Sequence, residues 1–169
     1  MYTKLSRIAQ LAAIHKSEAL TTLFHHIDEA MLHEAFHLVR KDGATGVDQV
    51  SGKQYAENLE QNLKTLLSRL RDKSYRAPMI RRARIGKPDG GERLLGIPTF
   101  EDKIVQKAVY MLMEPIYEQE FLDCSYGFRP GRDAHQALAA LREQCAKNQV
   151  QCVLDADIKS YFDTIPHAL

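Results

Sequence analysis

The sequence predicts an α+β fold, and three observations support this class. Helical periodicity without glycine or proline runs from Lys4 to Arg40. Two extended segments flank Pro88-Asp89-Gly90-Gly91, a sequence typical of a β-hairpin turn. Near the end, "QCVLDADI" (residues 151–158) alternates with the period of a β-strand. A chain of 169 residues can form one domain with a hydrophobic core.

The N-terminal third is predicted to be helical. The first helix covers residues 4–40 and ends at "KDGATGVD", where Gly43 and Gly46 are stop and turn signals. A second helix is predicted from about Ser51 to Lys73. The predicted packing faces consist of Ile27, Met31, Leu32, Ala35, Phe36 and Val39 in the first helix, and of Leu59, Leu63, Leu66, Leu67 and Leu70 in the second.

Two further helices are predicted after the hairpin. Thr99 is a candidate N-cap for a helix that runs toward Met113, and Pro115 is expected to kink or break it. "SYGFRPGRD" (125–133) is predicted to be a loop, followed by a helix from Asp133 to Cys145. The predicted buried face of that helix consists of Ala134, Ala137, Leu138 and Leu141.

Charge, cysteine content and hydropathy limit the partners and the cellular compartment that the sequence is compatible with. The formal net charge is +1, so a nucleic-acid partner has to be argued from the positions of the charges. Cys124, Cys145 and Cys152 are odd in number and form no C-x-x-C pair, which argues against a zinc site or a disulfide framework. The sequence also lacks an apolar run of about 18 residues and the apolar core of a signal peptide. We therefore expect a cytoplasmic protein with no membrane contact.

The hairpin is rich in basic residues. Its cations are Arg81, Arg82, Arg84, Lys87 and Arg93, and its acids are Asp89 and Glu92. A two-stranded ribbon with glycines at its tip can bring backbone N–H groups close to phosphates while the cations neutralise them. The alternative interpretation is a solvated edge hairpin whose charge opposes aggregation. Both interpretations stay open on composition alone.

Acidic residues gather near the C-terminus. Asp155, Asp157 and Asp163 lie within nine residues, and a carboxylate at a strand end suits a divalent metal ion. The alternative is that Asp157 caps the next helix, and spacing alone favours this alternative. His33 and His37 are four residues apart on a predicted helix, but no third ligand supports a metal site there.

Four motifs occur in order along the chain. They are "GATGVD" (43–48), "YRAPMIRRARIGKPDGGERLLGIPTFEDKIVQKAV" (75–109), "DCSYGFRPGRDAHQAL" (123–138) and "LDADIKSYFDTIPH" (154–167). Together they resemble the reverse transcriptases, or maturases, that bacterial group II introns encode. The resemblance implies an N-terminal helical extension over 1–50, fingers over 51–150, and the start of a truncated palm over 151–169.

The resemblance also implies a function and its residues. The family copies RNA into DNA, which implies intron or template RNA, a DNA primer, deoxynucleotides (dNTP) and Mg²⁺ as partners. Asp157 matches the palm aspartate that binds the catalytic metals, and the Ile158 carbonyl would add a ligand. Lys87 and Arg93 match the pair that clamps the triphosphate, and Phe162 matches the gate against a 2′-hydroxyl. Arg81 looks like the residue that covers the templating base, and Arg81, Arg82 and Arg84 are the candidate RNA contacts.

Two departures from the family pattern limit these expectations. Gly86 stands where the family usually has proline, and the Ala-Asp-Asp turn that supplies the second metal-binding aspartate is absent. The primer grip, thumb and maturase regions are absent too, so we expect the 169 residues to be inactive without a C-terminal palm and thumb region. The alternatives are a non-catalytic RNA-binding module, and a reverse transcriptase of a retron, a CRISPR locus or a diversity-generating element.

Overall fold

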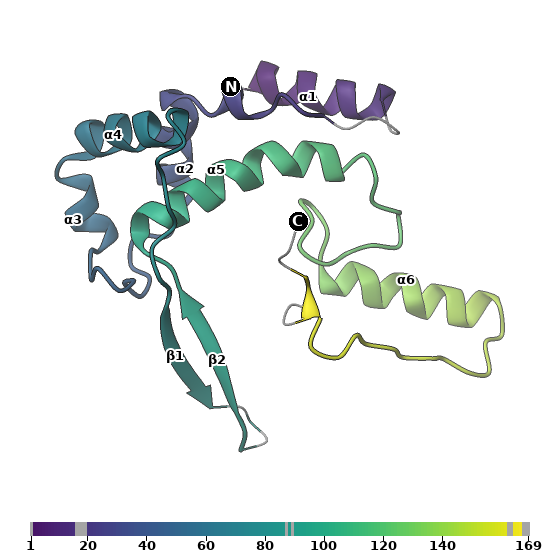
Figure 1. Ribbon diagram of the computed structural model, residues 1–169. Coiled ribbons are helices and arrows are strands. Elements are labelled where there is room, and N and C mark those ends of the chain that lie inside the picture. The colour runs from purple at the N-terminus through teal and green to yellow at the C-terminus, as the bar shows by residue number, and fades with distance from the viewer. Residues whose placement is uncertain (1, 16–19, 87, 89, 162–163, 167–169) are drawn as a thin grey trace. The chain divides into compact units, whose positions relative to one another are not determined.

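The computed structural model describes residues 2–15, 20–86, 88, 90–161 and 164–166. The chain forms two compact units, residues 1–121 and residues 122–169 (Figure 1). The first unit contains several helices and a two-stranded antiparallel sheet, and the described residues of the second contain one α-helix among loops. The predicted α+β class is confirmed.

The N-terminal helical segment is interrupted, which corrects the prediction of one helix over 4–40. The structure has α1 (Tyr2–Ile14), a short 3-10 helix η1 (Phe24–His26) and α2 (Glu29–Leu38). α2 begins where it does because Asp28 has an extended backbone and its Oδ1 accepts a hydrogen bond from the Met31 N–H at 2.9 Å. The side chain of Lys4 on α1 also binds the Asp28 carboxylate, which ties the two helices together.

The predicted second helix is likewise two helices, α3 (Gly52–Ala56) and α4 (Leu59–Arg71). A capping box starts α3, in which Ser51 and Gln54 bond each other's backbone N–H. The chain leaves helical geometry at Asn58, whose φ is −126° and ψ 41°. The predicted leucine stripe of α4 is confirmed: Leu63, Leu66, Leu67 and Leu70 are buried, and Leu59 is partly buried against the same core.

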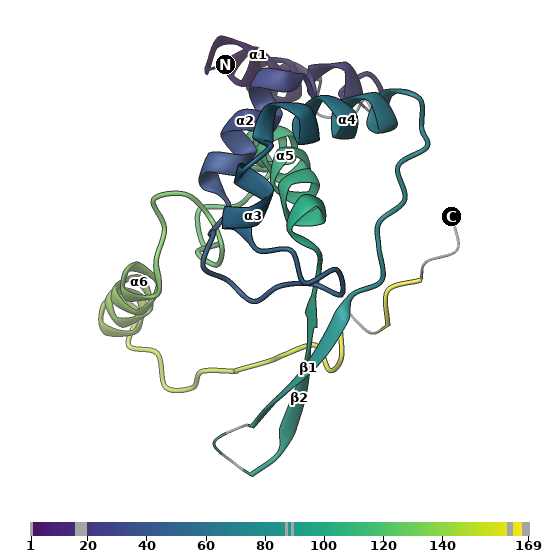
Figure 2. The ribbon, with the colours of Figure 1, turned by 90° about the vertical axis from the view of Figure 1, so that its left-hand side faces the viewer.

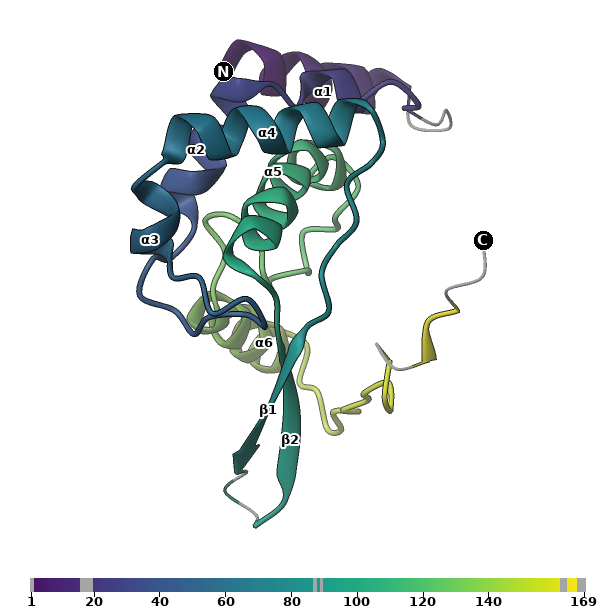
Figure 3. The ribbon, with the colours of Figure 1, turned by 60° about the vertical axis from the view of Figure 1, so that its left-hand side comes forward.

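The longest helix, α5 (Phe100–Tyr117), is the centre of the core of the first unit. It contacts α1, α2 and α3, while α4 packs against α2 and α3 (Figure 3). Thr99 is its N-cap, as predicted, and accepts a hydrogen bond from the Asp102 N–H at 3.3 Å. The helix continues past Pro115 for two residues, so of the predicted kink or break the break is wrong. Pro115 has no N–H to donate to the carbonyl of Met111, four residues back, so the helix continues with this one backbone hydrogen bond missing.

The hairpin consists of β1 (Arg81–Gly86) and β2 (Glu92–Ile97), and it leaves the helices of its unit as a separate arm (Figure 2). Its register pairs Arg81 with Ile97 at the base and Gly86 with Glu92 near the turn. Ile97 is buried, whereas most of the arm is exposed. The arm is therefore attached to the core at its base only.

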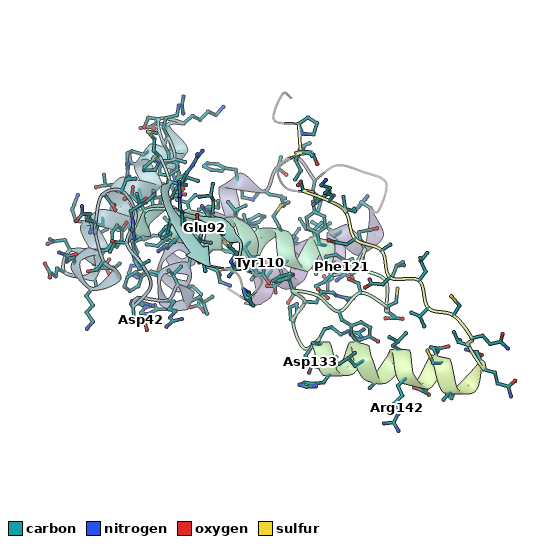
Figure 4. The ribbon with its side chains drawn as sticks, turned by 90° about the horizontal axis from the view of Figure 1, so that it is seen from below. Asp42, Glu92, Tyr110, Phe121, Asp133 and Arg142 are labelled. Carbon is teal, nitrogen blue, oxygen red and sulfur yellow. The ribbon has the colours of Figure 1, made fainter. Side chains whose placement is uncertain are left out.

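The second unit contains α6 (Ala134–Lys147), and Asp133 caps its first turn through a bond from the Gln136 N–H (Figure 4). The predicted buried face of α6 is wrong: Leu138 is 63% and Leu141 49% exposed. Residues 151–158 form no strand, which corrects that prediction as well. Alternation alone cannot make a strand without a pairing partner, and the described residues provide none for this segment.

In the parts of the chain that the structure covers, no helix combines the length and apolarity needed to cross a lipid bilayer.

Candidate nucleotide and nucleic-acid interface

The hairpin register divides its basic residues between two faces. Cross-strand partners share a face, and faces alternate along each strand. Arg82 and Arg84 therefore lie on one face, where their cross-strand partners are Gly96 and Leu94. Arg81 lies on the other face, with Ala83 and Ile85 on its own strand and Leu95 and Arg93 on β2. The described arginines of the two strands therefore do not all lie on one face.

The two faces differ in their surroundings. On the first face, Arg84 pairs with Glu92 at 3.4 Å, and both side chains are mostly exposed (Figure 4 labels Glu92). Arg82 is exposed as well. The Arg82–Arg84 face is therefore open to a large polyanion. A pair of exposed charges at that distance is weak enough to be exchanged for a phosphate contact.

The base of the hairpin is braced by residues 43–49, which we call the base loop. Arg81 Nε donates to the Thr45 carbonyl at 2.9 Å, and Lys103 Nζ on α5 donates to the Ala44 carbonyl at 2.6 Å. Gly46 lies against the backbone of Pro98 and Thr99, where β2 ends and α5 begins. Arg81 thus has a structural contact that sequence reasoning missed.

A polar network fixes the start of α5, and through it the end of β2. Glu101 binds Arg69 and accepts a hydrogen bond from the Tyr55 hydroxyl at 3.3 Å. The Tyr75 hydroxyl donates to Asp102 Oδ1 at 2.8 Å. Burial, followed by the adjoining carboxylates, raises the pKa of both tyrosines, so both stay neutral donors across the physiological range.

The candidate metal ligands belong to the second unit. Asp157 is exposed in the irregular segment 151–158, and Ile158 beside it is also exposed. A carboxylate and a backbone carbonyl are hard oxygen donors, which fit a divalent cation that keeps several waters. Asp157 belongs to no described cluster of three ligating side chains. The donor chemistry fits one metal ion, but these residues cannot by themselves hold two.

Several predicted site residues lie outside the described residues. They are Lys87, Phe162 and Asp163, together with Asp89 of the turn. Of the remaining predicted residues, the hairpin brings Arg82 and Arg84 together on one face and Arg81 and Arg93 on the other.

The loop before α6 is organised by its own arginines. Arg129 donates to the carbonyls of Leu122 and Ser125 at 2.9 and 2.8 Å. Arg132 lies over the ring of Tyr126, 5.4 Å from its centroid. These arginines of "SYGFRPGRD" therefore have local structural contacts in the second unit.

The chain is similar in sequence to one protein family and to several known proteins. The family described as reverse transcriptase (RNA-dependent DNA polymerase) matches residues 85–169. Protein YkfC of Escherichia coli K12 is 40% identical over 127 residues, which are 73% of this chain and 33% of YkfC. The group II intron-encoded protein LtrA of Lactococcus lactis subsp. cremoris is 39% identical over 109 residues, 64% of this chain and 18% of LtrA.

A third relative matches a shorter part of the chain. Nuclear intron maturase 2, mitochondrial, of Arabidopsis thaliana is 44% identical over 62 residues, 33% of this chain and 8% of the maturase. The chain thus spans a third or less of the length of these three relatives. Reverse transcriptases as a family use a divalent metal ion and act on nucleic acids. The chain belongs to the reverse transcriptase family and, by its relatives, to the group II intron type.

Proposed function

We propose that these residues serve RNA-directed DNA synthesis, as the N-terminal portion of a group II intron-type polymerase in the cytoplasm. Residues 1–50 would be an N-terminal extension, 51–150 the fingers, and 151–169 the first part of the palm. The observation that carries the proposal is the family match over 85–169, which includes most of the hairpin and all of the segment around Asp157.

Each candidate residue has one proposed role. Asp157 and the Ile158 carbonyl hold Mg²⁺, whose chemistry is to neutralise the phosphates during transfer. Lys87 and Arg93 bind the triphosphate of the incoming deoxynucleotide with charge-assisted hydrogen bonds. Phe162 blocks the 2′-hydroxyl of a ribonucleotide.

The hairpin face with Arg82 and Arg84 is the proposed contact to the RNA backbone. Its support is the exposure of both side chains and the weak, exchangeable pair between Arg84 and Glu92. Each phosphate that a cation neutralises releases counterions, so affinity falls as salt rises. Arg81 would approach the template beside the base loop, where its Nε already donates to Thr45.

The RNA contact is tested by a matched pair of charge reversals. Arg82→Glu with Arg84→Glu alters the hairpin face, and Lys64→Glu with Arg71→Glu alters the exposed side of α4 by the same charge. Binding of the 169-residue chain to a structured RNA is measured by fluorescence anisotropy over a salt series. The hairpin variant should lose affinity at low salt. The slope of its logarithm of affinity against the logarithm of salt concentration should become shallower by about 1.5–2. The α4 variant should keep the wild-type slope. Equal effects from both variants would refute the hairpin contact.

The catalytic role is tested separately in a full-length protein that contains these residues. Asp157→Asn should abolish Mg²⁺-dependent primer extension on RNA and leave RNA affinity unchanged, because the variant keeps the hairpin and loses a metal ligand. Full extension by this variant would contradict the assignment. If the full-length wild type bound RNA but never extended a primer under Mg²⁺, the non-catalytic RNA-binding module would replace the polymerase.

A further inference from the structure

We propose that Glu29, His33 and Glu60 form a binding site for a first-row divalent transition-metal ion, with Zn²⁺ as its probe. The site lies in the first unit, on the surface where α2 meets α4. One ligand atom from each side chain lies within 4.8 Å of the other two. His33 Nε2 and Glu60 Oε1 are 3.1 Å apart.

The helices fix this convergence. Glu29 and His33 are four residues apart, so they share a face of α2, and Glu60 belongs to the first turn of α4. Leu32 and Leu63, from the same two helices, are fully buried in one core cluster. The three side chains therefore project from packed helices, which hold ligands more firmly than loops do.

The charge of the cluster favours a cation. Two carboxylates face one imidazole, so the cluster carries a charge of −2 when His33 is neutral and −1 when it is protonated. Within the described part of the chain, His33 is the one basic group paired with either carboxylate. Acids are common in the first turn of a helix, where the helix dipole stabilises them. That preference explains each glutamate singly, but it does not explain why both converge on a histidine.

The donor set selects the class of metal. Imidazole with carboxylates suits zinc and its first-row neighbours, whereas Mg²⁺ and Ca²⁺ prefer oxygen ligands throughout. Three protein ligands leave a fourth position for water. The side chain of His33 is 28% exposed and that of Glu60 67% exposed, so an ion can enter directly from solvent. This site belongs to the first unit and uses an imidazole ligand, whereas Asp157 belongs to the second unit.

The sequence places His33 and His37 four residues apart, and no third ligand is evident for them from the sequence. In the structure, His37 lies at the exposed C-terminal turn of α2, where its carbonyl accepts a hydrogen bond from Lys41. His37 is absent from the ligand cluster, and it therefore provides a matched control on the same helix.

The test uses the full 169-residue chain after dialysis against a chelator. Calorimetric titration with Zn²⁺ should show one ion per chain, and excess Mg²⁺ should not compete. Glu29→Gln, His33→Gln and Glu60→Gln should each weaken binding by about tenfold or more, while His37→Gln binds as the wild type does. Saturating Zn²⁺, at about a hundred times Kd, should raise the Tm of the wild type by about 5–10 °C and that of Glu60→Gln much less.

Other histidines could also bind zinc, and the design separates them. The rings of His25 and His26 lie 3.9 Å apart. If His26→Gln abolished binding while Glu60→Gln left it intact, the proposed site would be wrong. Failure of Zn²⁺ to bind or to stabilise the wild type would reduce the cluster to a His33–Glu60 ion pair and overturn the proposal. Because Glu60 is exposed, circular dichroism should show the Glu60→Gln variant folded. None of these readouts involves RNA or polymerase activity.

Discussion

Gly46 should be the most sensitive residue of the base loop to substitution by alanine. A Cβ at this position would lie 2.6 Å from the Thr99 Cα, 2.7 Å from the Thr99 nitrogen and 2.9 Å from the Pro98 carbonyl oxygen. All three are backbone atoms at the junction of β2 and α5, so none can rotate away. The loop would have to move, and its movement would disturb the hydrogen bonds from Arg81 and Lys103.

The size of the effect follows from two opposing terms. Overpacking a well-packed site costs about 1–3 kcal/mol, and three simultaneous backbone overlaps place Gly46→Ala near the upper end. Gly46 does not have a left-handed φ, so alanine stabilises by about 0.4–1 kcal/mol through the unfolded state. The net loss of unfolding free energy is about 2 kcal/mol. With a urea m-value of about 2 kcal/mol/M, the unfolding midpoint should fall by about 1 M.

Gly43→Ala is the matched control, because it makes the same change in the same loop. The nearest atom to a Cβ at Gly43 is the Arg40 carbonyl oxygen at 3.8 Å, an ordinary contact. Its stability should stay within about 0.5 kcal/mol of the wild type or rise slightly. Equal losses from both variants, or no loss from Gly46→Ala, would refute the close-packing argument.

Three further predictions concern the core, the tyrosines and the proposed sugar gate. Leu63 is fully buried, so Leu63→Ala should cost about 2–5 kcal/mol in urea unfolding, and a cost under 1 kcal/mol would contradict its place in the core. The pKa values of Tyr55 and Tyr75 in the folded chain are raised above the ordinary value of 10.0. As the pH rises, the unfolded chain therefore releases these protons at a lower pH than the folded chain does. The free energy of unfolding is therefore fully retained below about pH 10 and falls as the pH rises further, which urea midpoints at about pH 8 and pH 11 should show. Tyr75→Phe should reduce this alkaline loss, and an unchanged loss would rule out Tyr75 as a source. In a full-length polymerase, Phe162→Ala should raise ribonucleotide incorporation relative to deoxyribonucleotide in primer extension, and unchanged selectivity would leave Phe162 without a gating role.

Local chemistry made part of the fold predictable. The pairing of the two hairpin strands, the Thr99 cap and the leucines of α4 depend on residues close in sequence, and all are present in the structure. The interruption before α2 was missed because it depends on the side chain of Asp28 and on no glycine or proline. A polar cap inside a long helical pattern gives no periodic signal.

Long-range contacts could not be predicted either, because they too give no periodic signal in the sequence. The bond from Arg81 to Thr45 spans 36 residues and that from Lys103 to Ala44 spans 59. A side chain that donates to a distant carbonyl leaves no pattern in the sequence. The strand predicted over 151–158 also depends on a partner, because hydrogen bonds to a second strand decide whether an alternating segment becomes one. The basic character of the hairpin was readable from sequence, whereas its division into two faces required the register.

The buried apolar side chains of the described residues all belong to residues 1–121, which has a consequence for synthesis on the ribosome. Translation proceeds at about 5–20 residues per second, so the 48 residues from 122 to 169 take about 2–10 s to add. Helical domains with mostly local contacts fold in microseconds to milliseconds. The first unit can therefore close its core, and set the hairpin against the base loop, as soon as residue 121 has left the ribosome, without waiting for residues 122–169 to fold.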